Sequence, residues 1–283
     1  MADQGESGGT AGTGAAAPSG CGRAELNGRP VSEAELRALA LTGYGHFTTM
    51  CVEDGRVRGL QLHLDRLVRD CRTVFGTELD VERVRAYARR VVPTAGAMVV
   101  RVTVFDPALD IGTIGSPAEP QLLVTTRPAS GTSPLRPVPP LRVRSVAYRR
   151  ELPAVKSVGL FGALWQRREA QRAGFDDALF VDGERGISEG GTWNIGFVRG
   201  REVVWPNAEH LPGTTMELLR GLYPGRTERV TVAEAAGFEA AFATNAAIGV
   251  RAVGGLDSLA FPPGHPVIEE LRSRYVALTG DQL

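Results

Sequence analysis

The chain has 283 residues, enough for one large domain or two modest ones with a substantial core. Its 32 Lys and Arg balance its 32 Asp and Glu, which argues against a nucleic-acid-binding or membrane-surface protein, because such binding needs an uncompensated basic face. Hydrophobic residues make up 43% and charged residues 23%, as in ordinary globular proteins, and no apolar run approaches membrane-spanning length.

The positive charges are divided very unevenly between the two residue types. All are arginines except one lysine, Lys156. Arginine cannot replace lysine where a neutral amine must attack a carbonyl, so the lone lysine is the first candidate for a catalytic residue. The alternative is an ordinary surface lysine, and the depletion of lysine elsewhere weighs against it.

Cysteine and histidine usage excludes other kinds of site. The three cysteines are too few and too widely spaced for a disulfide framework or a zinc site, which predicts a reduced, cytoplasmic protein. The four histidines form no metal-binding pattern, so no metal is expected. Residues 1–22 are mostly small and polar, with no cation for a signal peptide, and are predicted to be a disordered tail.

The first predicted domain, an α+β unit, covers residues 24–127. Asn27-Gly28 is a hairpin turn signal, and Ser32 with Glu35 forms the capping-box pattern of a helix start. β-branched and aromatic residues then predict a strand that ends at a turn around residues 54–55. Further along, residue spacing predicts helices over 60–75 and 81–92 and strands over 98–105 and 122–126.

A proline-rich segment predicts a domain boundary. Residues 128–140 contain five prolines, which favours an extended linker. The second domain, 141–283, is also predicted to be α+β, because long helices do not alternate with parallel strands. Its expected elements are a strand over 141–148, a helix over 160–173, strands over 178–181, 196–198 and 202–205, and a helix over 215–222.

Three features of the second domain suggest chemistry together. Lys156 follows a predicted strand between two valines, and apolar neighbours lower an amine's pKa by disfavouring its charged form. Glu189 lies in a predicted glycine-flanked loop, where a carboxylate can face the ring nitrogen of a pyridine cofactor. Residues 210–219 form a turn opening into a helix, which is suited to a phosphate. Taken alone, Glu189 would be interpreted as a turn residue, and the start of the helix within residues 210–219 as an ordinary helix cap.

A lysine, an acid and a phosphate-binding turn in this order resemble the fold-type IV pyridoxal-phosphate enzymes. This class IV aminotransferase family includes branched-chain and D-amino-acid aminotransferases and aminodeoxychorismate lyase. The resemblance runs from about residue 26 to residue 261 and is strongest over 156–219. It implies a two-domain, D-amino-acid-aminotransferase-like α+β fold, pyridoxal 5'-phosphate as cofactor, amino acids and 2-oxo acids as substrates, and a homodimer.

The resemblance also assigns roles around the cofactor. It implies that Lys156 forms the internal aldimine and shuttles the substrate α-proton, and that Glu189 faces the pyridine nitrogen. Thr214 and Thr215, in the L-P-G-x-T segment, would bind the phosphate, and Asn245 would lie at the cofactor.

Arg66 completes this assignment. Residues 63–67 match the family's H-x-x-R-L helix, which implies that Arg66 binds the cofactor phosphate. The alternative is an i,i+4 pair with Asp70 on a solvated helix face.

Three residues are expected on the substrate side. Arg101 falls where branched-chain enzymes carry an active-site arginine, and could bind a substrate carboxylate or be an outward strand residue. Residues 45–49 resemble the lyase's F-T-T segment, which implies substrate contacts for Phe47 and Thr49.

Three functions follow from these patterns. The first is amino-group transfer between an amino acid and a 2-oxo acid. The second is aminodeoxychorismate lyase, which eliminates pyruvate to leave p-aminobenzoate and is motivated by Thr48, Thr49 and Asn245. The third is a family member that has lost its cofactor chemistry, motivated by departures from the family pattern at Phe161, Met216 and Ala246. Pyruvate release without an amino acceptor separates the second from the first.

Overall fold

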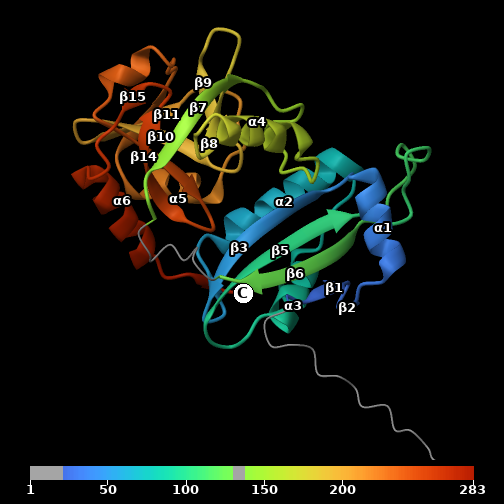
Figure 1. The fold of residues 1–283 in the computed structure, drawn as a ribbon. Helices are drawn as coiled ribbons and strands as arrows, with labels where there is room; N and C mark the ends of the chain where they lie inside the picture. Colours follow the sequence, from blue (N-terminus) through green and yellow to red (C-terminus); the bar gives the residue numbers. More distant parts are fainter. Residues whose placement is uncertain (1–21, 130–137) are drawn as a thin grey trace, which may run out of the picture.

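The computed structural model describes residues 22–129 and 138–283. Most of the predicted tail and of the predicted linker lies outside these described residues. Figure 1 shows two lobes, each built around its own sheet. The architecture is α+β, as predicted, while the exact domain boundaries stay a prediction.

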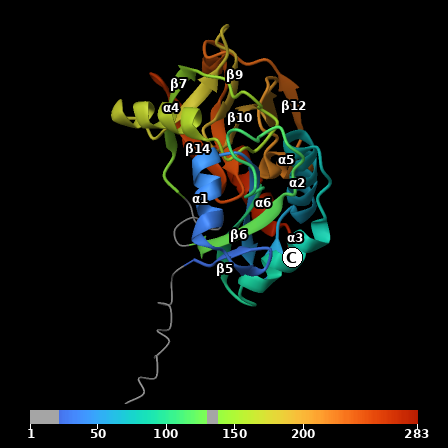
Figure 2. The ribbon, with the colours of Figure 1, turned by 90° about the vertical axis from the view of Figure 1, so that its right-hand side faces the viewer.

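The first lobe is a seven-stranded antiparallel sheet in the order β16-β4-β3-β5-β6-β1-β2. Its strands are β1 (Ala24–Leu26), β2 (Arg29–Pro30), β3 (His46–Glu53), β4 (Arg56–Val57), β5 (Ala97–Phe105), β6 (Gln121–Pro128) and β16 (Asp281–Gln282). Its helices are α1 (Glu33–Thr42), α2 (Leu60–Phe75) and α3 (Val81–Val91). The C-terminal strand β16 therefore belongs to the first sheet, although the sequence places it in the second domain; Figure 2 shows the C-terminus beside α3.

Local sequence signals explain the elements of this lobe. Asn27 and Gly28 take the left-handed conformation of a tight hairpin turn, with φ of 49° and 79°. The Ser32–Glu35 capping box begins α1. Helix α2 has a strongly apolar side that packs on the sheet and α3, with Leu64, Leu67 and Cys71 in the core.

The second lobe is a nine-stranded sheet, in which eight strands follow the order β12-β11-β10-β13-β14-β7-β8-β9 and the ninth, β15, pairs with β14. Strand β9 also pairs with β10, which closes six of the strands into a barrel-like ring. The strands are β7 (Leu141–Ala147), β8 (Asp177–Val181), β9 (Ile187–Gly190), β10 (Asn194–Arg199), β11 (Glu202–Pro206), β12 (Gly225–Glu228), β13 (Ala240–Asn245), β14 (Gly249–Leu256) and β15 (Leu259–Ala260). The helices are α4 (Phe161–Arg172), α5 (Thr214–Leu222), the short η1 (Glu234–Gly237) and α6 (Pro266–Ala277).

Alternate strand residues in this lobe pack on opposite faces. Phe197 lies in the core cluster inside the ring, while Val198 packs outside with α5 and α6. Strand β13 behaves in the same way, with Ala241 on one side and Phe242 on the other. Because both faces are buried, β13 lacks the polar alternation that marks a strand in sequence, and it was not predicted.

The two lobes meet where α2 begins. A side chain at Gly59 would meet Thr214 and Leu218 of α5 at 3.0 Å, so these helix starts lie against each other. At Gly45, a Cβ would approach the Val104 carbonyl oxygen to 2.5 Å, which requires glycine immediately before β3. Gly59 thus lies against the start of α5, and the Gly45 carbonyl accepts from Val158 in the segment between β7 and α4. These two places carry most of the predicted functional residues of the second lobe.

Candidate active site

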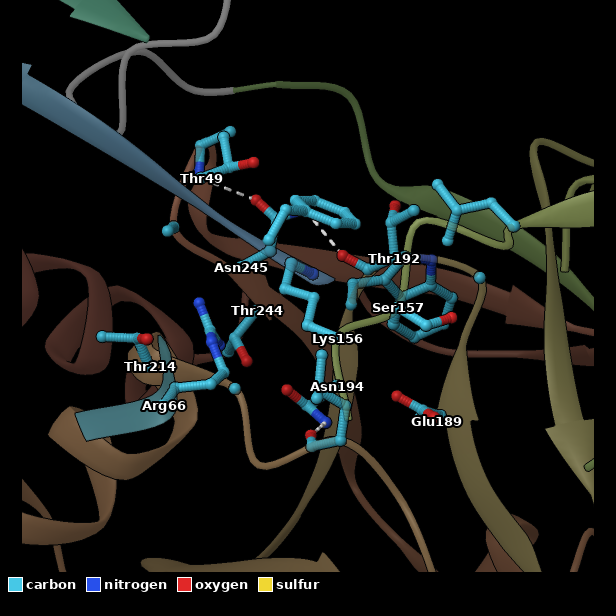
Figure 3. A pocket seen from close by; sticks show the side chains of 18 of the residues that line it. Thr49, Arg66, Lys156, Ser157, Glu189, Thr192, Asn194, Thr214, Thr244 and Asn245 are labelled. Carbon is cyan, nitrogen blue, oxygen red and sulfur yellow. Dashed lines mark hydrogen bonds between the residues drawn. The ribbon is translucent and has the colours of Figure 1, made fainter. Parts of the chain in front are cut away.

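A cavity of about 310 Å³ opens between the lobes. Both sheets contribute to its wall, and Figure 3 shows Lys156 near the middle, with Arg66, Thr214 and Thr244 on one side and Glu189 on the other. The predicted residues that line it are Phe47, Thr49, Arg66, Arg101, Lys156, Glu189, Thr214 and Asn245.

Lys156 lies in the segment between β7 and α4. Its backbone N–H donates to Asp70 Oδ2 at 2.9 Å, and its carbonyl accepts from the Phe47 N–H at 2.9 Å. Its Nζ lies 4.9 Å from the centroid of the Phe47 ring. The amine is therefore held at the cavity wall by elements of the other lobe.

The surroundings of Lys156 favour a neutral amine. Burial, reinforced by the positive charges of Arg66 and Arg150, lowers the pKa of Lys156 to about 7, although Glu189 opposes the shift. A large fraction of the amine is consequently unprotonated near neutral pH and able to act as a nucleophile or a base.

Arg66 projects from α2 into one end of the cavity. Its Nη2 donates to Thr48 Oγ1 at 2.5 Å and contacts His63 Nδ1 at 3.2 Å. Asp70 forms its ion pair with Arg69 rather than with Arg66, so the i,i+4 pair considered from the sequence does not form. Burial lowers the pKa of Arg66 to about 10, and its Nε has no hydrogen-bond partner among the described residues.

Two buried hydroxyls lie at the same end. Thr214 is the first residue of α5 and Thr244 is the second-to-last residue of β13, and the Oγ1 of each has no hydrogen-bond partner in the described part of the chain. The N-cap residue of α5 is Gly213, where a Cβ would meet Asn194 Oδ1 at 2.0 Å. Free helix N–H groups, two hydroxyls and a guanidinium fit a phosphate dianion. These residues fit the phosphate of pyridoxal phosphate.

Two predicted cofactor residues are placed differently from Thr214. Thr215 is buried but does not line the cavity, and it lies against the hydroxyl of Tyr275. Asn245 lines the cavity, yet its Oδ1 accepts the N–H groups of Ala247 and Ile248. Its side chain therefore stabilises the turn between β13 and β14.

Glu189 occupies the opposite end. It lies in strand β9, not in the predicted loop, and it is 3% exposed. Its Oε1 accepts from Arg150 Nε at 2.8 Å, and Arg150 Nη2 donates to the Gly191 carbonyl at 2.8 Å. Burial raises the pKa of Glu189, and Arg150 acts against that rise. A paired, buried carboxylate at this point fits the ring nitrogen of the same cofactor.

The three residues expected on the substrate side lie on one face of the first sheet. Phe47, Thr49 and Arg101 share this face, with Thr49 and Arg101 paired across β3 and β5. The Arg101 guanidinium lies 3.6 Å above the Phe47 ring, and its Nε donates to Thr103 Oγ1. Arg101 therefore faces the cavity, and burial lowers its pKa.

Sequence reasoning missed several residues of the cavity wall. One is Arg127 on β6, a diagonal neighbour of the predicted Arg101. Among the described residues neither arginine has a carboxylate partner, which leaves both able to bind anions. Arg150 and Thr244 were also missed. Each is brought to the site by tertiary contacts with residues far away in sequence, and only the run of arginines at 149–150 after a predicted strand was a signal.

The departures from the family pattern have different settings. Phe161 is 80% exposed at the start of α4, stacks on Trp165 and does not line the cavity. Met216 is buried in the core beside α6, while Ala246 lines the cavity.

No group of three or more His, Cys, Asp or Glu side chains within 22–129 and 138–283 is arranged to hold a metal ion. Over the same residues, no helix has the length and apolar character needed to cross a membrane.

Known structures share this fold. A branched-chain aminotransferase from the archaeon Thermoproteus uzoniensis, crystallised with norvaline, has a TM-score of 0.77 and 20% identity over 90% of this chain and 93% of that chain. A hypothetical aminotransferase from Mycobacterium tuberculosis, in a PLP-bound form, has a TM-score of 0.73 and 21% identity over 90% and 98%. A fold IV transaminase from Curtobacterium pusillum has a TM-score of 0.68 and 23% identity over 83% and 84%.

Sequence comparison gives a narrower result. No curated protein sequence matches this chain. The family model for class IV amino-transferases, however, matches residues 45–255, which include α2, the lysine segment, β9 and the start of α5. Fold, cavity and family model thus agree, and the chain belongs to the class IV aminotransferase family.

Proposed function

We propose that this protein is a pyridoxal-phosphate-dependent aminotransferase that moves an amino group between an amino acid and a 2-oxo acid. One observation carries the proposal. The amine of the single lysine, with a pKa of about 7, lies between a buried, paired carboxylate and a cluster of buried donors without partners. An aminotransferase needs these three groups in one cavity.

When bound, pyridoxal phosphate supplies an aldehyde that captures amines and a protonated pyridine ring that withdraws electrons from the substrate α-carbon. Arg66 and Thr214 are suited to hold the phosphate, with Thr244 beside them. Glu189, whose ionised form Arg150 favours, can hold a proton on the ring nitrogen. Lys156 Nζ can accept a proton and return it, because its pKa lies near neutral pH.

The two arginines on the sheet face are suited to substrate carboxylates. Arg101 and Arg127 lie at diagonal positions on neighbouring strands, about 7–8 Å apart at the backbone. Long guanidinium side chains at that spacing can reach one carboxylate together or two carboxylates separately. The Phe47 ring lies next to both the Arg101 guanidinium and the lysine amine, and it can pack against the carbon skeleton of the substrate.

The lyase function remains the second candidate because Thr49 lines the cavity. The other two residues that motivated it are occupied elsewhere. Thr48 bonds to Arg66 and His63, and the Asn245 side chain supports its own turn. These contacts favour transfer over elimination.

A two-part assay tests the proposal. Protein loaded with pyridoxal phosphate is mixed with amino acids, and the conversion of cofactor to its amine form is followed by absorbance, with and without a 2-oxo acid. Transfer predicts conversion by an amino acid alone and reversal by the oxo acid. Pyruvate release from aminodeoxychorismate with no acceptor would identify the lyase instead, and the absence of both activities would favour the third function.

We also propose a homodimer in the cytoplasm. Phe161, Leu164 and Trp165 are exposed apolar residues of α4, with Phe161 stacked on Trp165, and such a surface is suited to a protein contact. Figure 2 shows α4 projecting at the edge of the second lobe. Sedimentation equilibrium of the protein and a Trp165→Glu variant tests the contact.

The buried Cys51 and Cys71 are free thiols, in keeping with a reducing compartment.

A further inference from the structure

The backbone of the lysine segment is held by two charged residues of α2. Asp70 is fully buried, and its Oδ2 accepts the Lys156 N–H at 2.9 Å. Its Oδ1 accepts from Arg69 Nε at 3.1 Å and from Arg69 Nη2 at 2.7 Å. Arg69 Nη2 also donates to the Ala154 carbonyl at 2.7 Å. One ion pair thus binds the main chain at two points, two residues apart.

The same helix also carries the proposed phosphate-binding arginine. Arg66 lies three and four residues before Arg69 and Asp70, which places all three on neighbouring positions of one helix side. A rigid helix therefore connects the anion-binding end of the cavity with the backbone of Lys156. The position of the Arg66 guanidinium relative to the Lys156 backbone therefore depends on α2 alone, because the same helix carries Arg66 and the residues that bind that backbone.

Other bonds to this segment are purely main-chain. The Lys156 carbonyl accepts from the Phe47 N–H, and the Val158 N–H donates to the Gly45 carbonyl at 3.0 Å. No side-chain substitution removes these bonds directly. Asp70 supplies the side-chain bond to the Lys156 peptide, and burying a carboxylate is costly unless such bonds compensate it.

We propose that Asp70 and Arg69 are positioning residues, which fix residues 154–156 so that Lys156 Nζ stays enclosed over the Phe47 ring. The proposal rests on Lys156 being the reactive lysine of the proposed function. Neither residue lines the cavity, so both act through the lysine backbone. Loss of either one lets the amine move toward water.

The single lysine of the chain makes this directly measurable without cofactor. Acylation of Lys156 by acetic anhydride is followed across pH in cofactor-free protein, by peptide mapping, and its midpoint reports the amine's pKa. Arg66, Arg150, Arg101 and Glu189 face the amine and are unchanged in every variant. The wild-type midpoint is expected near 7.

In Asp70→Ala the midpoint is expected to rise, because a solvated amine regains its charged form. The direction of the midpoint shift distinguishes a positioning role of Asp70 from a purely electrostatic one. Removing a negative charge alone would lower an amine's pKa, whereas release of the segment raises it. Each unit of rise reduces the neutral amine about tenfold at pH values below the midpoint, so borohydride trapping of pyridoxal phosphate at pH 6.5 slows accordingly.

Matched variants complete the test. Asp70→Asn keeps an acceptor oxygen and removes the charge, so its midpoint should not rise and should stay at or slightly below that of the wild type. Asp65→Ala removes an exposed carboxylate of the same helix and should change nothing. Where Asp70→Ala does not fold, Arg69→Gln provides the test, because it removes the guanidinium bond to Ala154 while Asp70 remains. Its control is Arg72→Gln, which removes an exposed positive charge from the same helix, so a rise caused by charge alone would appear in both variants.

A folded Asp70→Ala or Arg69→Gln protein with the wild-type midpoint and trapping rate would overturn the positioning role. Failure of the proposed function looks different. In that case wild-type protein traps no cofactor at Lys156, while the acylation midpoints, which need no cofactor, still report on Asp70 and Arg69.

Discussion

The two ends of the cavity solve the problem of buried charge in opposite ways. At the Glu189 end, the carboxylate and Arg150 neutralise each other within the protein. At the Arg66 end, a buried guanidinium and two hydroxyls lack partners for some of their polar atoms among the described residues. The first end is complete before any ligand arrives, and the second is completed by an anion. If the proposed roles hold, the residues for the ring nitrogen are already paired in the folded protein, whereas those for the phosphate carry a desolvation cost that the anion would offset.

The largest effect is expected from breaking the complete end. Arg150→Leu leaves the Glu189 carboxylate buried without its partner, which costs about 3–5 kcal/mol of folding stability where the carboxylate is charged. Because burial raises the pKa of Glu189 above its unfolded value, and loss of Arg150 raises it further, the deficit grows as pH increases and shrinks in acid. Urea unfolding at pH 5 and pH 8 measures it.

The control for this variant is Arg149→Leu. Arg149 is the preceding residue and forms an exposed pair with Glu209, which contributes little to stability. Equal losses in the two variants, or a loss at position 150 that does not depend on pH, would contradict the account of the Glu189 end.

A substitution at the Arg66 end should have the opposite effect, with weaker cofactor binding and no loss of folding stability. Arg66→Gln removes a charged phosphate contact of about 1.5–3 kcal/mol, so pyridoxal phosphate should bind about 10- to 150-fold more weakly. Pyridoxal, which has no phosphate, should lose much less affinity, because Arg66→Gln affects it only through the pKa of Lys156. The cofactor-free variant should be no less stable than the wild type, since it loses a buried charge that has no ion-pair partner in the part of the chain that the structure describes. Equilibrium titration with both cofactors and urea unfolding check the three parts.

A smaller effect is expected from one hydroxyl. Thr214→Val keeps the shape of the side chain and removes a neutral hydrogen bond of about 0.5–1.5 kcal/mol, which weakens pyridoxal phosphate binding about 2- to 12-fold. Thr215→Val is the matched neighbour, because Thr215 does not line the cavity. If both variants lose affinity equally, the placement of Thr214 alone at the anion is wrong.

The smallest effect is electrostatic and needs no substitution. The Arg66 charge helps to lower the pKa of Lys156, so inorganic phosphate bound at that end should cancel part of this influence and raise the pKa. The acylation midpoint of Lys156 should move upward with added phosphate and return on dialysis. A midpoint that does not change with added phosphate would show that anion binding near Arg66 has no electrostatic effect on Lys156.

What could be predicted from the sequence depended on how local its cause is. Helix α2 has the predicted bounds because its apolar spacing is written in its own residues, and the capping box of α1 is equally local. Lys156 stood out through its isolation among arginines. The Arg150–Glu189 pair joins residues 39 positions apart, and only the closure of the second sheet brings them together.

The choice between two adjacent threonines shows the same limit at finer scale. The motif named Thr214 and Thr215 together, but the helix begins at Thr214, so successive side chains point about 100° apart. One lines the cavity and the other packs near Tyr275. A sequence motif cannot indicate on which side of a helix each member lies until the helix start is known.

One measurement tests the central claim most directly. Protein incubated with pyridoxal phosphate is reduced with borohydride, digested and mapped by mass spectrometry. The account predicts one labelled peptide, carrying the cofactor on Lys156 at one per chain, and none in Lys156→Ala. A label confined to the N-terminal amine, no label at all, or equal labelling of Lys156→Ala would contradict it.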